Sequence, residues 1–538
     1  MLKRGVLKTR DYRIFTIINT DDNGESSKNV AFEGASNAAQ AFHNDTVEWI
    51  EGEDGCNSAK VIRVISRAES SRFHVGTLEL NSKTRYGMTS RGALLFRFTP
   101  FDPAYPPFFV GCSKKDTSQN ILVRIEFDKW TDNSTCPRGN LIQTFGVAGD
   151  MKAEENALLY HYSPVKWGQG KASPTDTIVV PKMDVELYPF LDLPTFHIDP
   201  PGCKDIDDAI TIEEVGINEY AVHIHIADVA AWLRKNRWLQ EKAAAIGQTL
   251  YCDGKAVNPM FPLELSENAF SLLPGQLRRV LTCSFKWKRG LGQDADVTWS
   301  SRTIRVTHSY TYESAQDAPW AAVLSEICGT SDSHKWVEHL MLFYNKEAAK
   351  LLRQYGKGLL RRHAAPKEEL LTVCKELGLP AEKMAMAAGE YCLAQEDDVH
   401  HWGIGTALYC HASSPIRRWA DCLNQMCLTE ILRKYIEGGA VAVDKTTVSS
   451  IQELSKKAKS YERELVFLRL ILAPNPTSSL KGVVVKEGRV WVHHWDRTIK
   501  VDTRSLVAGS EVRVFYFYNP SERNWKSRIV FRVDSLGN

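Results

Sequence analysis

The chain has 538 residues, of which 43% are hydrophobic and 25% are charged, and its net charge is only +2. Such a length is too great for one hydrophobic core and predicts roughly three to five domains. No run of about 18 uncharged apolar residues occurs, which excludes an ordinary membrane-spanning helix. The small net charge excludes a uniformly basic surface, so any binding of nucleic acid has to depend on local positive charge.

The cysteines and the N-terminus indicate a compartment. Twelve cysteines are scattered without a Cys-x-x-Cys pair, and the closest two are Cys422 and Cys427. This pattern is typical of free thiols in a reducing environment and not of a zinc site or a disulfide scaffold. No apolar stretch follows residues 1–5, so we expect no signal peptide. The sequence therefore predicts an intracellular protein, without distinguishing cytoplasm, nucleus or organelle.

Short alternating apolar segments separated by turn residues fill the first 165 positions. These segments are 12–18, 46–50, 60–65, 75–80, 94–98 and 121–125. Short strands with regular breaks favour small β-barrels, and we expect one barrel over 1–75 and a second over 76–165. Four aromatic residues of the second barrel could stack on bases, although core packing is the more common role. They are Phe96, Phe98, Phe108 and Phe109.

The stretch 197–210 concentrates acidic residues. Asp199 is followed by a tight-turn signal, Pro200-Pro201-Gly202, and then by Asp205, Asp207 and Asp208. Like charges this close raise one another's pKa unless a cation lies between them. Carboxylate oxygens suit hard cations, so the sequence predicts a Mg²⁺ site, with Mn²⁺ as the alternative. The competing interpretation is an acidic surface turn that binds a loose Ca²⁺ or nothing, although the spacing is not that of an EF-hand.

Residues 220–229 follow with strand alternation. Val222, Ile224 and Ile226 form one apolar face, and His223 and His225 lie on the other. Two histidines at this spacing could ligate a metal. We favour the alternative that they are solvent-facing or hydrogen-bonded side chains of the strand.

A second motif lies at residues 409–421 and contains Ser414-Pro415, which is a helix-start signal. It places Arg417 and Arg418 in the first turn of a helix, where cations oppose the helix dipole. A bound anion would relieve this conflict, because backbone N–H groups and guanidinium groups together form a phosphate pocket. The alternative is a surface arginine pair that bridges to acidic residues.

The C-terminal part predicts a helix and a further barrel. Residues 450–453 fit a capping box, and apolar residues then recur at helical spacing to about residue 472. A linker is expected at 473–479 because it contains two prolines. Residues 480–538 alternate again and hold 11 Lys/Arg against 6 Asp/Glu, which suits an RNA-binding barrel.

Together these motifs resemble the ribonuclease II / ribonuclease R (RNB) family. The resemblance is strongest at 197–230 and 400–421, and the run Asp199-Pro200-Pro201-Gly202-Cys203 is similar to the eukaryotic exosome-type branch. The resemblance implies an α+β fold in a compact version. A central RNB catalytic domain over 166–473 would be flanked by two cold-shock-like barrels and by an S1-like barrel over 480–538.

The resemblance also implies an activity and residue roles. It predicts a 3′-to-5′ exoribonuclease that hydrolyses single-stranded RNA to nucleoside 5′-monophosphates with Mg²⁺. Asp199, Asp205, Asp207 and Asp208 would hold the metal. Asp207, Arg417 and Glu338 would serve catalysis, while Tyr251, Tyr312 and Arg418 would contact RNA. We expect a monomer that binds no membrane, and association with an exosome core is not readable from the sequence.

Two other functions remain open. One is a catalytically silent RNA-binding regulator on the same scaffold, although all four aspartates are present. The other is a metal-dependent hydrolase of small nucleotides, which barrels at both ends disfavour. The chain departs from the family in short segments at 316–338 and 366–400, in Trp419, and in Gln425-Met426 where His-Arg is usual.

Overall fold

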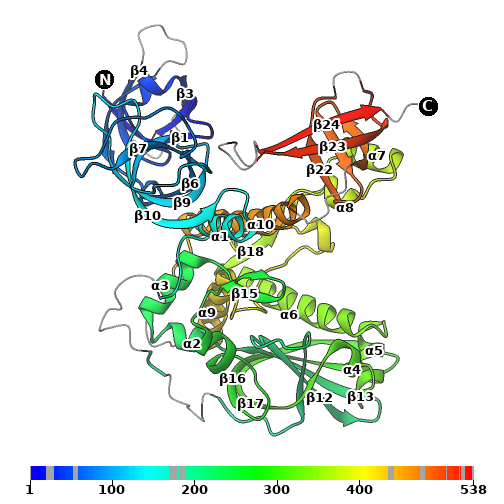
Figure 1. The fold of residues 1–538 in the computed structure, drawn as a ribbon. Helices are drawn as coiled ribbons and strands as arrows, with labels where there is room; N and C mark the ends of the chain where they lie inside the picture. The colour runs from blue at the N-terminus through cyan, green and yellow to red at the C-terminus, as the bar shows by residue number, and fades with distance from the viewer. Residues whose placement is uncertain are drawn as a thin grey trace. The chain divides into compact units, whose positions relative to one another are not determined.

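A computed structural model describes residues 2–19, 29–51, 59–168, 178–180, 186, 188–433, 441–472, 479–503, 506–519, 522 and 528–535, without the side chains of residues 294, 295, 382 and 383. The chain divides into two compact units (Figure 1). Unit one comprises residues 1–164 and 463–538, and unit two comprises 165–462. The linker expected at 473–479 lies outside the described residues except for Ser479.

Unit one begins with a 5-stranded sheet in the order β3-β2-β1-β4-β5. Its inward residues alternate along each strand, and Leu7, Phe15, Ile17 and Trp49 are completely buried. The strands are β1 (Lys3–Thr9), β2 (Ile14–Asn19), β3 (Val30–Glu33), β4 (Thr46–Glu51) and β5 (Ala59–Ser66).

The second group of strands closes into a barrel in the order β10-β8-β7-β6-β9. Phe96, Phe98 and Phe108 are buried in its core, so the core role expected for most of these aromatics is confirmed. Phe109 is half-buried and stacks on Tyr86 with ring centroids 4.6 Å apart. The strands are β6 (Phe73–Leu78), β7 (Leu94–Pro100), β8 (Phe108–Cys112), β9 (Ile121–Lys129) and β10 (Arg138–Val147).

A C-terminal 5-stranded sheet, in the order β22-β21-β20-β23-β24, completes unit one. Arg528, which is 0% exposed, contacts the carboxylate of Glu154 in α1 (Met151–Tyr162) and donates to Thr77 Oγ1 at 2.8 Å. The strands are β20 (Leu480–Lys486), β21 (Arg489–Val492), β22 (Arg497–Lys500), β23 (Glu511–Tyr518) and β24 (Ile529–Ser535). The expected α+β architecture with flanking barrel-type sheets is confirmed.

Unit two is built on a closed barrel in the order β11-β12-β13-β16-β17. Its strands are β11 (Thr195–Ile198), β12 (Asp208–Gly216), β13 (Glu219–Ala227), β16 (Leu277–Lys288) and β17 (Gly292–Tyr310). Val222, Ile224 and Ile226 are buried against α6 (Ser333–Tyr355), as the alternation predicts. His223 and His225 lie on the opposite face, where His223 Nδ1 is 2.8 Å from Ser284 Oγ and His225 bonds to two threonines. Both histidines are therefore hydrogen-bonded side chains of the strand, which is part of the preferred interpretation.

The remaining elements of unit two are helices and two 2-stranded sheets. The helices are α2 (Ala230–Leu233), α3 (Arg237–Ile246), α4 (Tyr312–Ala315), α5 (Ala321–Cys328), α7 (Glu368–Glu376), α8 (Ala381–Met384) and α9 (Trp419–Arg433). One sheet is a hairpin of β14 (Leu250–Cys252) and β15 (Lys255–Asn258), and the other pairs β18 (Leu359–Arg362) with β19 (Glu390–Leu393). Short helical turns are formed by Ala35–Ala38 and Glu69–Ser71 in unit one and by Leu265–Ala269 and Trp402–Ile404 in unit two.

Two predicted helix starts are wrong. Arg417 and Arg418 lie in the turn before α9, which begins at Trp419, because the buried Asp421 holds the turn from inside the helix. The helix expected from residue 450 is α10 (Lys445–Ile471). Its start is capped by Asp444, whose carboxylate accepts from Thr447 N at 2.8 Å. Gln452 serves a different purpose and accepts from Tyr391 N at 2.9 Å.

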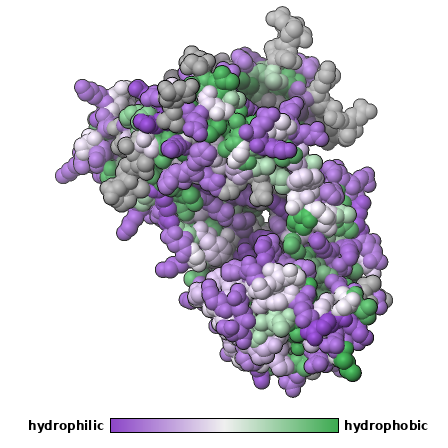
Figure 2. Space-filling view, turned by 90° about the vertical axis from the view of Figure 1, so that its right-hand side faces the viewer, coloured by the Kyte–Doolittle hydropathy of each residue, from purple (hydrophilic) through white to green (hydrophobic). Residues whose placement is uncertain are grey.

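The surface mixes hydrophilic and hydrophobic residues. Figure 2 shows a face on which hydrophilic residues predominate and hydrophobic ones are scattered among them. Within the described ranges, no helix is both long enough and apolar enough to span a bilayer. The eleven cysteines that the structure describes are all free thiols.

Candidate active site

The acidic residues lie on the loop that joins two adjacent strands of the unit-two barrel. Strand β11 pairs antiparallel with β12, with Phe196 opposite Ile210, so the connecting loop returns to its starting point. Its tight turn is closed by Cys203 N donating to Pro200 O at 3.1 Å, and Gly202 adopts a φ of +81° that suits glycine. Asp199 enters this loop and Asp208 leaves it, as the sequence predicts.

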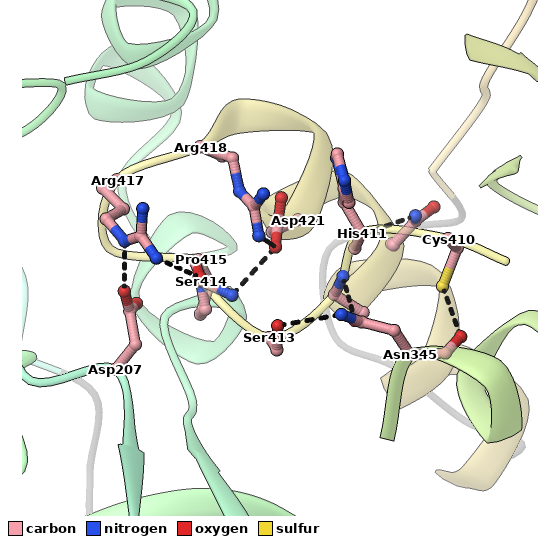
Figure 3. Close-up of polar contacts among 12 residues, drawn as sticks. Asp207, Asn345, Cys410, His411, Ser413, Ser414, Pro415, Arg417, Arg418 and Asp421 are labelled. Atoms are coloured by element: carbon pink, nitrogen blue, oxygen red, sulfur yellow. Dashed lines mark hydrogen bonds and ion pairs between the residues drawn. The ribbon is translucent and has the colours of Figure 1, made fainter. Parts of the chain in front are cut away.

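Asp207 connects the acidic loop, which is residues 199–208, to the arginine turn, which is residues 414–418 before α9. Its Oδ1 accepts from Ile416 N at 2.9 Å and its Oδ2 accepts from Arg417 Nε at 3.1 Å (Figure 3). Asp207 is only 5% exposed, and burial raises its pKa to about 7. Arg417 and the Ile416 N–H oppose this rise, while Asp205 and Asp421 add to it. Arg417 therefore reaches the acidic loop through Asp207.

The arginine turn is held by hydrogen bonds to the buried carboxylate of Asp421 in α9. Asp421 is fully buried, and its Oδ1 accepts from Ser414 N at 2.8 Å and from Arg418 Nη2 at 2.9 Å. Ser414 Oγ in turn accepts from Arg417 Nη2 at 2.9 Å. Figure 3 shows Arg417 directed to Asp207 and Arg418 directed to Asp421. The two arginines therefore have different partners, and the side chain of Arg417 remains 45% exposed.

Asp208 lies close enough to Asp199 and Asp207 for their charges to act on its carboxyl group. The pKa of Asp208 is raised well above its ordinary value by burial and by the charges of Asp199 and Asp207. Asp199 Oδ2 is 2.8 Å from His197 Nδ1, and Asp205 accepts from the hydroxyl of Tyr251. The Cys203 thiol has a pKa raised to about 12 by burial and by Asp199 and Asp205.

This donor set suits a hard divalent cation in its chemistry. Oxygen ligands with excess negative charge are what Mg²⁺ prefers, and a cation would relieve the repulsion that raises the pKa of Asp208. Among the described residues, no three His, Cys, Asp or Glu side chains already form a metal-binding group. The fit is thus one of charge and ligand type, and the carboxylates do not form a preassembled cage.

Tyr312 lies beside this loop, whereas the recorded contact of Glu338 is with Lys335 on α6. Tyr312 is half-buried and stacks on His334 with ring centroids 3.8 Å apart. Burial and the charges of Asp199 and Asp208 raise the pKa of Tyr312, so this ring is close to the acids. Glu338 is exposed, ion-paired with Lys335, and one turn of α6 beyond His334. Within the described contacts, nothing connects Glu338 directly to the acidic loop.

Sequence reasoning missed several residues that build the site. Asn345 in α6 accepts from Ala412 N at 2.9 Å and donates to Ser413 Oγ at 3.0 Å, which fixes the segment that leads into the arginine turn. Asp421 lies at the end of the motif at residues 409–421, but the sequence analysis gave it no role. His197 shares a strand face with Asp199, a period-two signal that could have been used. For Asn345 the sequence carries no comparable signal.

Two family models match the chain. Residues 188–320 and 322–434 match the model described as "RNB domain". Residues 95–163 match "Dis3-like cold-shock domain 2 (CSD2)".

Curated relatives agree with these matches. Human "Exosome complex exonuclease RRP44" is 23% identical over 519 residues, covering 74% of this chain and 54% of the relative. "DIS3-like exonuclease 2" of Schizosaccharomyces pombe is 24% identical over 521 residues, covering 74% of this chain and 55% of the relative. The chain thus spans about half the length of the curated relatives it matches.

Solved structures give the same fold. RNase R of Mycoplasma genitalium in complex with ribose-methylated single-stranded RNA has a TM-score of 0.69 at 16% identity, covering 99% of this chain and 97% of that one. Yeast Ssd1, described as a pseudonuclease, has a TM-score of 0.67 at 14% identity, covering 96% and 81%. At these identities the structures establish the fold alone. The barrel, acidic loop and arginine turn all fall within the residues that match the RNB domain model, and the chain therefore contains an RNB domain.

Proposed function

We propose that this protein is an exoribonuclease that hydrolyses single-stranded RNA from its 3′ end and releases nucleoside 5′-monophosphates with Mg²⁺. The observation that carries the proposal is the contact of Asp207 with Arg417 beside Asp199, Asp205 and Asp208. In metal-assisted hydrolysis of a phosphodiester, carboxylates hold the cation and a guanidinium stabilises the negative charge that develops on the phosphate. Both are available within one loop and one turn.

The roles of the acids follow from their contacts. Asp199, Asp205 and Asp208 would hold Mg²⁺, or Mn²⁺ in its place. The bound ion would supply an activated water and neutralise charge on the phosphate. Asp207 is the fourth proposed ligand, and both of its oxygens already accept N–H groups. We infer that its main contribution is to orient Arg417.

Arg417 is the group we assign to the scissile phosphate. Asp207 and Ser414 hold two of its nitrogens, Nε and Nη2, and so fix the plane of the guanidinium. The exposed remainder is available to a phosphate oxygen, which a planar fork of donors binds well. Asp207 also raises the pKa of Arg417 against the opposing effect of burial, so the group stays charged.

The remaining assignments are also proposals. Tyr251 and Tyr312 would position the last nucleotides, and Tyr251 already contacts Asp205. Glu338 would help order the site from α6. Arg418 would contact RNA only with the part of its side chain that Asp421 leaves free, and 24% of it is exposed.

A catalytically silent RNA-binding regulator is the second candidate. It is favoured by the likeness to yeast Ssd1, which is described as a pseudonuclease. The presence of all four aspartates and of Arg417 supports the enzyme instead. A hydrolase of small nucleotides is the third candidate, and barrel-type sheets before and after the RNB domain in the sequence favour a polymer over it.

One experiment separates the three candidates. RNA labelled at its 5′ end, and separately at its 3′ end, is incubated with the protein with Mg²⁺ or with a chelator. Mononucleotides released from the 3′ end only with Mg²⁺ support the exoribonuclease. Binding without cleavage supports the regulator, and neither binding nor cleavage supports the third candidate.

Four finer points are proposed: the branch of the family, the RNA partner, the oligomeric state and the compartment. The Pro200-Pro201-Gly202-Cys203 turn and the similarity to RRP44 favour the exosome-type branch within the family. Single-stranded RNA is the proposed partner, and the complex of RNase R with single-stranded RNA supports this choice. We expect a monomer in solution and a reducing compartment, consistent with the free thiols.

A further inference from the structure

His197 is buried, and among the described residues its side chain has a single polar partner, the proposed metal ligand Asp199. It is 4% exposed, and its Nδ1 lies 2.8 Å from Asp199 Oδ2. Its other ring nitrogen, Nε2, is buried and has no partner in the part of the chain that the structure describes. The imidazole therefore interacts through one atom with one acid.

The position of His197 follows from strand alternation in β11. Phe196 and Ile198 belong to the apolar core that packs on α6, so Thr195, His197 and Asp199 share the opposite face. A carboxylate only accepts hydrogen bonds, so the proton of the imidazole lies on Nδ1 and points to Asp199. This contact fixes one oxygen of the carboxylate and leaves Oδ1 for a cation.

Stability alone does not explain a histidine here. Burying a ring nitrogen without a partner costs free energy, and an apolar residue would fill the same space without that cost. Rules of core packing are broken mainly where a site requires it. Groups that donate to a metal ligand orient it, and their loss typically weakens metal binding by about 10- to 100-fold.

We propose that His197 is a positioning residue that holds Asp199 in the orientation needed to bind the divalent cation. This inference rests on the proposed function, because it deepens the same metal site. It makes a prediction about atoms: the donor has to lie where Nδ1 lies. A side-chain amide at the Nδ1 position should still donate to Asp199 and preserve the function of the histidine, whereas an amide at the Nε2 position should not.

Asparagine and glutamine provide this comparison. In His197→Asn the side-chain amide falls near the position of Nδ1, and in His197→Gln it falls near that of Nε2. Both variants are polar and similar in size, so they share the general cost of substitution. The matched control is His225→Asn, since His225 is equally buried in the same barrel but bonds to Thr211 and Thr282 instead of an acid.

The experiment measures Mn²⁺ binding to the full-length protein without RNA, and the free ion is quantified by electron paramagnetic resonance. We expect His197→Gln to weaken Mn²⁺ binding by at least about tenfold, and His197→Asn to stay within a few fold of the unmodified protein. His225→Asn should lower the melting temperature without changing the Mn²⁺ affinity. Circular dichroism checks that each variant is folded under the conditions of the titration.

Several outcomes would overturn the inference. It fails if His197→Gln binds Mn²⁺ as tightly as His197→Asn, if His225→Asn weakens binding equally, or if the unmodified protein binds no Mn²⁺. Failure of the proposed function looks different. A protein that binds Mn²⁺ and shows the Asn-over-Gln order but releases no mononucleotides supports the role of His197 and removes the nuclease.

Discussion

The Asp207 carboxylate lies 3.1 Å from Arg417 Nε although 210 positions separate the two residues in the sequence. This contact joins the loop between β11 and β12 to the turn before α9. It also explains why an acid 5% exposed can be tolerated, because a guanidinium and a backbone N–H satisfy its two oxygens. The two residues are therefore best tested as a pair.

Asp207→Asn should abolish mononucleotide release and leave RNA binding intact. The amide oxygen can still accept from Ile416 N, so the loop stays attached to the turn. The negative charge that orients Arg417 is lost, and we expect a fall in hydrolysis of at least about a hundredfold. Gel analysis of labelled RNA and a filter-binding assay measure the two properties separately. Normal digestion by this variant would remove Asp207 from the mechanism.

Arg417→Lys should also lower the maximal rate by about a hundredfold. A lysine has one nitrogen, so it cannot contact Asp207 and Ser414 together while presenting further donors to phosphate. The matched control is Arg418→Lys, whose ammonium can still pair with Asp421. Single-turnover kinetics on short RNA test both variants. Equal losses in the two variants would contradict the division of roles between the arginines.

The sequence was sufficient for those parts of the site that local patterns determine. The turn at 200–202 and the alternation on both sides of it predict where the aspartates lie, because antiparallel pairing returns the chain to the same point. The resemblance to a known family added Arg417, which no local rule connects to these acids. The approach of the loop and the turn is a tertiary contact.

The start of α9 shows where local rules failed. Ser414-Pro415 is a valid helix-start signal, yet the helix does not begin there. Ser414 N donates to the carboxylate of Asp421 inside α9, and the residues between them form a turn before the helix. A buried carboxylate seven positions later decided the outcome. The role of Asn345 was unpredictable for the same reason, since it depends on which segments become neighbours in the folded chain.

Asp421→Asn should lower both stability and activity. It removes the buried charge that pairs with Arg418, and breaking such a pair typically costs about 3 kcal/mol or more. It also weakens the bond to Ser414 N, so Arg417 loses part of its support. Denaturant unfolding should show a lower midpoint with an unchanged slope. Restoring charge balance with Arg418→Gln in the same chain should recover part of the stability but not the activity.

The stability of the metal-free protein should fall as the pH rises toward neutrality. Burial raises the pKa of Asp207 to about 7, compared with about 3.9 for an unfolded chain, and the pKa of Asp208 is raised as well. Between these values the folded state binds protons that the unfolded state has lost. Its stability therefore decreases from about pH 4 to about pH 7 and this contribution is gone above that range.

Mg²⁺ competes with these protons, so it should raise the melting temperature more at about pH 8 than at about pH 5. Differential scanning fluorimetry with and without Mg²⁺ at both pH values measures the difference. Asp208→Asn, which removes a proposed ligand whose pKa is raised, should lose most of the stabilisation at the higher pH. An equal gain from Mg²⁺ at both pH values would mean that the cation does not bind at these carboxylates, since protonation would then leave its site unchanged.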